Sequence, residues 1–418
     1  MWDKTVRNMQ VEKMSGRKKA AGIVCVFMLA LLAFCFCDNG EKEERMPVMG
    51  KGEPMVIWIA SDLHFLSPDL SDGGEMFTRT VEGGDGKMVG DSEEIVDAFF
   101  AEVLEQKPDA LILSGDLTFN GEQESLEALA DKLDRLQTAG IPVLVIPGNH
   151  DIEYPYAGRY IGDRVEAADQ ISETDFKDIC GEFGYAAAVR KDRYSFSYLY
   201  LLAEDLGVLL LDSNTVKSPG EVSDETLKWM EEQLSWAREK GMEIISVSHQ
   251  NVLPQNDLLS AGFVMDNCGE VFGLLEKYGV KTHFSGHSHI WHSRTQNGLT
   301  DAAIGSLTVA PLGYGVVEID GARRVSYHQE NLTMLQDESR KFFDMLTERQ
   351  VRASLSELSL GEEVKREMVE FAVELNREYF AGTLENAGQL KRSGAWELWK
   401  ENGKDTFWYY YLDSILSE

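Results

Sequence analysis

Pro142-Val143-Leu144-Val145-Ile146-Pro147 is a short apolar run that leads directly into Gly148-Asn149-His150-Asp151. Its length and β-branched content are typical of a buried strand. The four residues after it place an amide and an imidazole side by side. Because Gly and Asn also favour simple turns, this segment could merely close the strand. The other interpretation, in which Asn149 is a metal ligand and His150 the nearest proton donor, depends on four further segments.

Each of these four segments also joins a strand-like run to potential metal ligands. Two ligands that lie two residues apart on an extended backbone point to the same side, which suits two ligands of one cation. The four segments are Met55–Ala60 with Asp62 and His64, Ala110–Ser114 with Asp116, Ile244–Ser248 with His249, and Lys281–Ser285 with His287 and His289.

Helix-period patterns separate the strands. Apolar residues at 95, 99 and 103 predict a helix from Ser92, and those at 126, 129, 133 and 136 predict another. This alternation of strand and helix predicts an α/β layered sheet. The polar segment Ser67–Gly90 predicts a long functional loop without regular structure. Further helices are expected at Thr174–Gly181, around Leu227–Leu234 and at Val271–Tyr278, and further strands at Tyr194–Tyr200, Val208–Leu211, Ala302–Ile304, Gly315–Glu318 and Arg324–Tyr327.

The five strand ends can converge, because ligands in open α/β sheets gather beyond the carboxyl ends of the strands. Oxygen and imidazole donors without a thiolate suit two divalent ions such as Mn, Fe or Zn rather than a structural zinc cluster. Asp116, alone on its Gly turn, is the natural bridging ligand. Singly, an Asp after a strand could be a helix cap and a His could belong to the core. The candidate metal ligands are Asp62, His64, Asp116, Asn149, His249, His287 and His289.

These blocks together resemble the five motifs of the calcineurin-like metallophosphoesterases, over roughly Val56–Glu330. The resemblance implies a four-layer α/β/β/α sandwich. It also implies that Asp62, His64, Asp116 and His289 surround one ion, and that Asp116, Asn149, His249 and His287 surround the other. The segments Gly115–Glu122 and Gly148–Ile152, with the loop after His64 and a helical tail, are similar to bacterial extracytoplasmic cyclic-nucleotide phosphodiesterases of this superfamily.

The sequence departs from the Ser/Thr protein phosphatase branch of the superfamily at Phe119. That branch has an Asp at this place, which would orient His150. Asp151 is our candidate substitute, so His150 and Asp151 are the predicted catalytic residues. Two cations would lower the pKa of a bridging water, and His150 would donate a proton to the leaving alkoxide. His283 is expected to be structural and His328 to be a residue of a sheet, while His292 could touch the site from outside the ligand set.

Composition limits the partners. The chain has 418 residues, of which 43% are hydrophobic and 27% charged, enough for one large domain and an appendage. Its net charge is −31, and the six Lys/Arg and two acidic residues in 1–37 leave −35 for the remainder. Such a surface repels nucleic-acid polymers. We therefore expect a small phosphate ester as the substrate.

The N-terminal segment is expected to be a targeting segment rather than part of the folded domain. Ala20–Cys37 is an uncharged run behind Arg17-Lys18-Lys19, so residues 1–37 predict a membrane anchor, and the rest of the chain would be extracytoplasmic. A cleaved signal peptide, or lipid attachment at Cys35 or Cys37, remains an alternative. Residues 38–54 are expected to be a linker. The sequence leaves open whether Cys180 and Cys268 pair, and it does not predict the oligomeric state.

The expected domains are a metallophosphoesterase domain at 55–330 and an all-α C-terminal domain at 331–418. In the latter, Val364, Met368, Phe371 and Leu375 form one apolar stripe, and aromatic residues cluster at 396–411. The aromatics could pack on the domain itself and on the sandwich. Alternatively, the domain could cover the metal crevice or recruit a partner.

Three functions follow from these patterns. The first is a metal-dependent phosphodiesterase that acts on a cyclic nucleotide or a similar small diester. A phosphomonoesterase or nucleotidase would use the same ligands and differ only in the pocket walls. A non-catalytic phosphate-binding protein would be expected to have lost ligands, and none is lost in this sequence.

Overall fold

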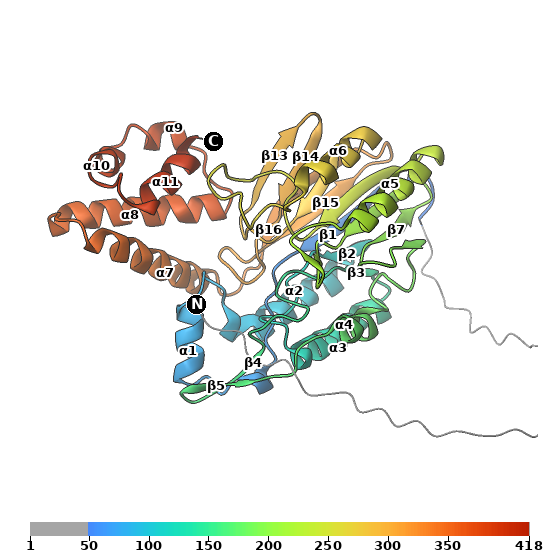
Figure 1. Cartoon of the computed structure of the whole chain (residues 1–418), viewed down its shortest axis with the longest axis horizontal. Helices are drawn as coiled ribbons and strands as arrows, with labels where there is room; N and C mark the ends of the chain where they lie inside the picture. The colour runs from blue at the N-terminus through green and yellow to red at the C-terminus, as the bar shows by residue number, and fades with distance from the viewer. Residues whose placement is uncertain (1–48, 418) are drawn as a thin grey trace, which may run out of the picture. The chain divides into compact units, whose positions relative to one another are not determined.

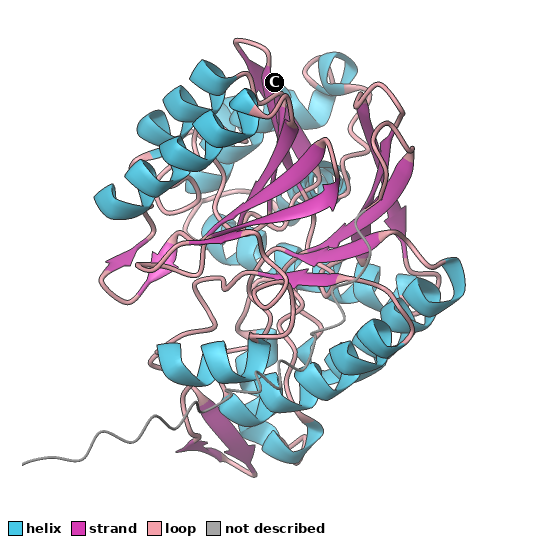
Figure 2. Cartoon of the chain, turned by 90° about the vertical axis from the view of Figure 1, so that its right-hand side faces the viewer, coloured by secondary structure: helices cyan, strands magenta, loops and turns pink. Residues whose placement is uncertain are grey.

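The computed structural model describes residues 49–417. Two β-sheets pack face to face between helices, as Figure 2 shows. The first sheet consists of β1 (Met55–Ala60), β2 (Ala110–Leu113), β3 (Val143–Val145), β15 (Gly313–Ile319) and β16 (Val325–Asn331). Its order is β16-β15-β1-β2-β3, and β1, β2 and β3 are parallel.

The second sheet has the order β13-β14-β12-β11-β8-β7-β6, in which β8, β11 and β12 are parallel. Its strands are β6 (Arg190–Lys191), β7 (Tyr198–Ala203), β8 (Leu206–Leu211), β11 (Glu243–Ser248), β12 (Thr282–Ser285), β13 (His292–Gln296) and β14 (Leu299–Ala303). Two short pairs, β4 (Gly158–Ile161) with β5 (Arg164–Ala167) and β9 (Asn214–Thr215) with β10 (Ser218–Pro219), lie outside the two sheets.

The period-two pattern of the strands explains the layers. In β1, Ile57 and Ile59 point into the core between the two sheets, whereas Trp58 points to the outer core beneath helices. In β8, Leu210 faces the inner core and Leu211 the second outer core. Because successive side chains of a strand face opposite sides, fully apolar strands can be covered on both faces. The expected four-layer α/β/β/α sandwich is confirmed.

Helices supply the outer layers. α2 (Ser92–Gln106), α3 (Gln123–Thr138) and α4 (Glu173–Cys180) cover the first sheet. α5 (Asp224–Glu239) and α6 (Cys268–Tyr278) cover the second. Each long helix buries the apolar stripe expected from its sequence, for example Leu126, Leu129, Leu133 and Leu136 in α3.

Two expectations for this region are wrong. Ser67–Gly90 contains regular structure: η1 (Pro68–Leu70), α1 (Glu75–Glu82) and the start of η2 (Val89–Asp91). α1 forms because Phe77 and other half-buried apolar residues pack in a small cluster with Tyr160. The strand expected at Tyr194–Tyr200 begins only at Tyr198, since the Ser195 hydroxyl is bound to the Asp192 carboxylate in a polar turn.

The C-terminal region is helical: α7 (Gln336–Ser356), α8 (Glu362–Phe380), α9 (Ala387–Leu390), α10 (Gly394–Asn402) and α11 (Phe407–Ser417), grouped in Figure 1. Its aromatics pack on one another and on Ile290 and Ala303 of the sandwich. Trp399 is fully buried and donates from Nε1 to the Met368 carbonyl at 2.9 Å. The packing agrees with the first of the two interpretations of this region.

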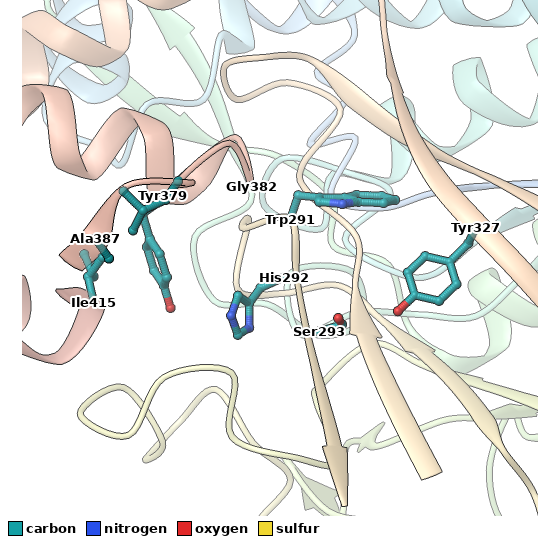
Figure 3. Close-up of a pocket in the computed structure, with 9 residues that line it drawn as sticks. Trp291, His292, Ser293, Tyr327, Tyr379, Gly382, Ala387 and Ile415 are labelled. Atoms are coloured by element: carbon teal, nitrogen blue, oxygen red, sulfur yellow. The ribbon is translucent and has the colours of Figure 1, made fainter. Parts of the chain in front are cut away.

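A cavity of about 400 Å³ remains where the helices meet the edge of the second sheet (Figure 3). His292 lines this cavity, and its Nδ1 is 3.1 Å from Oε1 of Gln255. His283 lies buried between the hydroxyls of Ser246 and Ser248, in keeping with a structural role. His328 is a residue of β16, as expected.

The first of the described residues contacts the second sheet of the sandwich. Met49, within the expected linker, donates its N–H to the Leu202 carbonyl at 3.1 Å. The anchor or signal predicted for residues 1–37 lies outside the described residues, and between 49 and 417 no helix is long and apolar enough to cross a membrane. Cys180 and Cys268 are both free thiols.

Candidate metal centre

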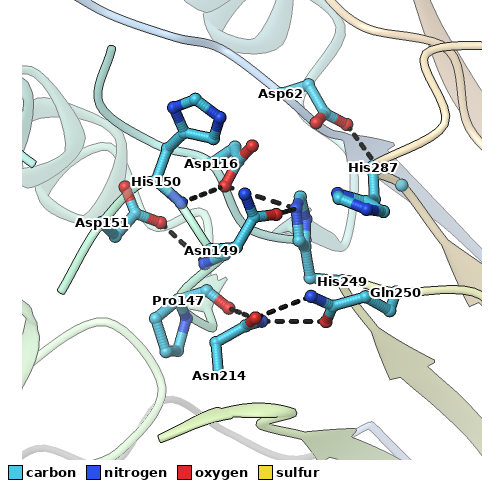
Figure 4. Close-up of polar contacts among 12 residues, drawn as sticks. Asp62, Asp116, Pro147, Asn149, His150, Asp151, Asn214, His249, Gln250 and His287 are labelled. Carbon is cyan, nitrogen blue, oxygen red and sulfur yellow. Dashed lines mark hydrogen bonds and ion pairs between the residues drawn. The ribbon is translucent and has the colours of Figure 1, made fainter. Parts of the chain in front are cut away.

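The structure brings all seven predicted ligands together at the carboxyl ends of the central strands; Figure 4 shows most of them. Three overlapping groups have potential ligand atoms within 4.8 Å of one another: Asp62, His64 and His289; His64, Asp116 and His150; and Asp116, His249 and His287. Asn149 joins the third group, because its Oδ1 is 3.1 Å from Nε2 of His249.

Asp62 anchors the first group. Its Oδ1 lies 3.3 Å from Nε2 of His289 and 3.8 Å from Nε2 of His64. Its Oδ2 accepts the backbone N–H of His287 at 2.9 Å. Oδ1 is buried and has no hydrogen-bond partner in the described chain. A buried carboxylate oxygen without a donor is costly, so this atom fits a cation ligand.

Asp116 lies between the two groups of histidines. Its Oδ2 is 3.8 Å from Nε2 of His64, and its Oδ1 is 3.3 Å from Nε2 of His249. The two oxygens of one carboxylate therefore face two different ligand sets, as a bridging ligand requires. Gly148 permits this arrangement, because a Cβ there would collide with Asp116.

Backbone carbonyls orient two of the histidines. Nδ1 of His249 is 2.9 Å from the Ser114 carbonyl, so Nε2 faces the centre. Nε2 of His287 is 2.7 Å from the Gly262 carbonyl, so Nδ1 is the nitrogen left for the centre. Such contacts fix the tautomer and the ring orientation of metal-binding histidines.

Burial and mutual charge shift the pKa values of these groups. Burial and, second to it, the neighbouring His249 lower the pKa of His287 to about 4. Burial also opposes the charged form of His249, but Asp116, Asp62 and the Ser114 carbonyl together outweigh it and raise the pKa of His249 to about 9. Burial would raise the pKa of Asp116, but the neighbouring histidines, His249 above all, hold it well below its ordinary value. A cation would have to displace a proton from His249 to bind there.

His150 stands beside the first group, with its ring 5.2 Å from that of His64. Its Nδ1 is 2.9 Å from the Phe119 carbonyl and 3.3 Å from Oδ1 of Asn120. Nε2 is therefore the nitrogen available to a substrate. Tyr154 stacks on the His150 ring with centroids 4.4 Å apart.

The hypothesis that Asp151 orients His150 is wrong, because the contacts of the His150 ring are to Phe119 and Asn120 instead. The fully buried Asp151 carboxylate binds backbone, and it ties the turn after β2 to the turn after β3. It accepts N–H groups from Gly148 at 2.7 Å, Thr118 at 2.9 Å and Leu117 at 3.2 Å, and the Thr118 hydroxyl at 2.9 Å.

Sequence reasoning missed several polar residues around the centre. Asn214 and Gln250 exchange amide hydrogen bonds of 2.6 and 2.9 Å beneath His249 (Figure 4). The Ser306 and Thr308 hydroxyls bind the backbone carbonyl of Asp62 at 2.8 and 3.2 Å. The only signal for Gln250 was its position next to a ligand; the others lie in segments without a motif.

Comparison with known proteins agrees with this geometry. Residues 55–291 match the family model described as calcineurin-like phosphoesterase, and residues 320–418 match the C-terminal domain of cyclic nucleotide phosphodiesterase. The first match spans more than half of the 418 residues. The chain therefore belongs to the calcineurin-like phosphoesterase family, and it also carries that C-terminal domain.

Two curated bacterial proteins are similar to this chain. A probable cyclic nucleotide phosphodiesterase from Moraxella catarrhalis is 26% identical over 47% of this chain and 64% of its own length. A glycerophosphodiester phosphodiesterase from Enterobacter lignolyticus is 25% identical over 44% of this chain and 58% of its own. The chain thus matches about three fifths of the length of these relatives.

Among solved structures, a dimetal phosphatase from Danio rerio aligns with a TM-score of 0.45 and 14% identity, covering 67% of this chain and 99% of that one. A putative 5'-nucleotidase from Staphylococcus aureus aligns with a TM-score of 0.39 and 13% identity, covering 70% of this chain and 58% of that one.

Proposed function

We propose that the chain is a dinuclear-metal phosphodiesterase that hydrolyses a small phosphodiester, with a cyclic nucleotide as the first candidate. The observation that carries this proposal is the position of Asp116, whose two oxygens face separate sets of histidines. The names of the M. catarrhalis relative and of the C-terminal family support the choice of substrate.

The donor set fits two divalent ions, with Mn or Fe as the first candidates and Zn as the next. Asp62, His64, Asp116 and His289 would hold one ion; Asp116, Asn149, His249 and His287 would hold the other. When bound, two such ions supply positive charge that activates water and neutralises phosphoryl oxygens. That charge would also offset the net −31 of the chain, which otherwise repels phosphate esters.

His150 would assist the leaving group. Its Nδ1 donates to the Phe119 carbonyl, so Nε2 carries a proton only when the ring is an imidazolium, and in that form the proton on Nε2 could pass to the leaving alkoxide. The Tyr154 ring limits the rotation of the imidazole by stacking on it. In this proposal His150 acts on the substrate, whereas Asp116 acts through the cations.

The proposal is tested by assaying the full-length protein with Mn²⁺ on bis-p-nitrophenyl phosphate and p-nitrophenyl phosphate, and then on 3',5'- and 2',3'-cyclic nucleotides. We expect the diester to be the better substrate and the Asp116→Ala variant to be inactive. A faster monoester rate would replace the proposal with a phosphomonoesterase or nucleotidase. Phosphate binding without turnover would indicate a non-catalytic protein.

Two further points are proposed on the sequence alone. Residues 1–37 would direct the chain across the membrane, as an anchor, a lipid-attachment segment or a cleaved signal. The metallophosphoesterase domain would then act outside the cytoplasm. Fractionation of cells expressing the full chain, with and without residues 1–37, tests this; a soluble cytoplasmic full-length chain would contradict it.

A further inference from the structure

A second charged pair lies next to the metal ligands, in the segment between α1 and η2. Oδ2 of Asp85 is 3.7 Å from Nδ1 of His289 and 3.4 Å from Nζ of Lys87. Nε2 of His289 faces Asp62 on the other side of the ring. Asp85 therefore contacts Nδ1 of His289, the ring nitrogen that faces away from Asp62. A carboxylate in this position can orient the imidazole of a metal ligand.

Lys87 is more buried than its partner. Only 11% of the Lys87 side chain is exposed, against 57% for Asp85. A covered ammonium usually needs close carboxylate partners. Lys132, with 14% exposure, has them, since its Nζ lies 2.6 Å from Asp97 and 3.5 Å from Glu93. Among residues 49–417, Lys87 has one ion pair, which is longer than a normal charge-assisted hydrogen bond, so its Nζ keeps donors for another acceptor.

The positive charge of Lys87 lies close to the centre. The same oxygen of Asp85 contacts both Nζ of Lys87 and Nδ1 of His289. One carboxylate oxygen therefore lies between the ammonium and the ring of a predicted ligand.

Contacts from distant parts of the chain fix this segment. Gly86 is buried with φ +101, and a Cβ there would lie 3.0 Å from Cδ2 of Phe343 in α7. The Met88 N–H donates to the Thr308 carbonyl at 2.8 Å. Phe343 is itself buried at 3% exposure, so a helix of the C-terminal region supports the backbone between Asp85 and Lys87.

We propose that Lys87 is a catalytic residue whose ammonium binds a non-bridging oxygen of the substrate phosphoryl group, while Asp85 and Phe343 position it. The inference rests on the proposed phosphoester chemistry of this centre. A preorganised cation in a water-poor site stabilises the charge that develops on the phosphoryl oxygens. It also gives the C-terminal region a part in the site, although that region supplies no predicted metal ligand.

The test compares Lys87→Gln with Lys87→Arg in the full-length, Mn²⁺-loaded protein, with Lys132→Gln as a control of similar burial. We expect Lys87→Gln to lower kcat/KM for the diester by about 100-fold while the metal content per chain stays unchanged. Lys87→Arg should recover part of the rate, and Lys132→Gln should stay near wild type. A Lys87→Gln rate near wild type, or loss of metal in this variant, would overturn the proposal.

A binding measurement separates this inference from the proposed function. Inorganic phosphate is titrated into the same metal-loaded proteins by calorimetry, and we expect Lys87→Gln to weaken its affinity about tenfold. If the wild type hydrolyses no diester but its phosphate affinity depends on Lys87, the proposed function fails and the inference stands. Equal affinities in the wild type and the variant overturn the inference.

The positioning role of Phe343 is tested by a double-mutant cycle. We expect Phe343→Leu to lower kcat/KM when Lys87 is present and to have little effect in the Lys87→Gln background, because its influence passes through Lys87. An equal loss in both backgrounds would mean that Phe343 acts on the centre by another route.

Discussion

Replacing Asp151 by Ala should destabilise the fold strongly, because one fully buried carboxylate accepts four hydrogen bonds. Three of the donors are backbone N–H groups in the turns after β2 and β3, and the fourth is the Thr118 hydroxyl. A buried donor without a partner costs about 1 to 3 kcal/mol. Since the hydroxyl can turn away and water can enter part of the space, we expect a loss of about 3 to 5 kcal/mol.

Asp151→Asn is the matched variant. Its amide keeps one acceptor oxygen but must place an NH₂ group where the other oxygen accepted from N–H groups. We therefore expect the free energy of unfolding to fall by about half as much as in Asp151→Ala. Urea unfolding of the metal-free proteins measures both values. A loss below about 1 kcal/mol for Asp151→Ala would refute the reasoning. If instead Asp151→Asn kept full stability and lost turnover, Asp151 would have the catalytic role that the sequence suggested.

Three further predictions concern the centre and its surroundings. Asp116→Ala should lose both metal and turnover, whereas His150→Ala should keep its metal and lose rate, which metal analysis beside steady-state kinetics can check; full activity of the Asp116 variant after reconstitution would contradict the bridging role. Burial raises the pKa of Glu122 from 4.5 to about 7. The folded state therefore binds a proton more tightly than the unfolded state, and this group's contribution to stability falls by about 3 kcal/mol as the pH rises from 4.5 to 7. Denaturant unfolding across this range should show a flatter profile for Glu122→Gln, and identical profiles would refute the shift. A chelator should lower Tm, and Mn²⁺ should restore it, as followed by calorimetry; an unchanged Tm would argue against a resident metal.

Much of the fold could be predicted from local patterns. The strands β1, β2 and β8 are apolar runs of four to six residues, and predicted ligands follow the ends of β1, β2 and β11. The helices α2 and α3 show apolar residues at helical spacing. These signals depend only on neighbours in sequence, so one chain is enough to detect them.

Elements that depend on distant contacts were harder to predict. α1 is rich in polar residues and contains no fully buried side chain. It becomes stable through half-buried contacts with Tyr160, which lies more than seventy positions later. Asp85 and Lys87 lie in the same Gly-rich stretch, where the composition suggested an irregular loop. Their partners His289 and Phe343 cannot be found from spacing along the sequence.

The role of Asp151 was also beyond sequence reasoning. An acidic residue next to His150 suggests a partner for the imidazole, since adjacent residues are often assumed to interact. The backbone instead directs the carboxylate toward the turn after β2, thirty-odd positions away, and leaves the imidazole to the Phe119 carbonyl. Only the path of the backbone decides between these two arrangements.

Backbone strain connects the stability of the centre with its cations. Five predicted ligands have a positive φ: Asp62, His64, Asp116, His287 and His289. Each such residue other than glycine costs about 1 to 3 kcal/mol, and strain of this kind persists only where surrounding contacts enforce it. The contacts are present, for example from the His287 N–H to Asp62 and from the Ser306 hydroxyl to the Asp62 carbonyl. The buried carboxylates of Asp62 and Asp116 also repel each other, and bound cations would relieve that repulsion. Cation binding and the stability of these loops should therefore be coupled, which is the physical reason to expect a lower Tm after chelation.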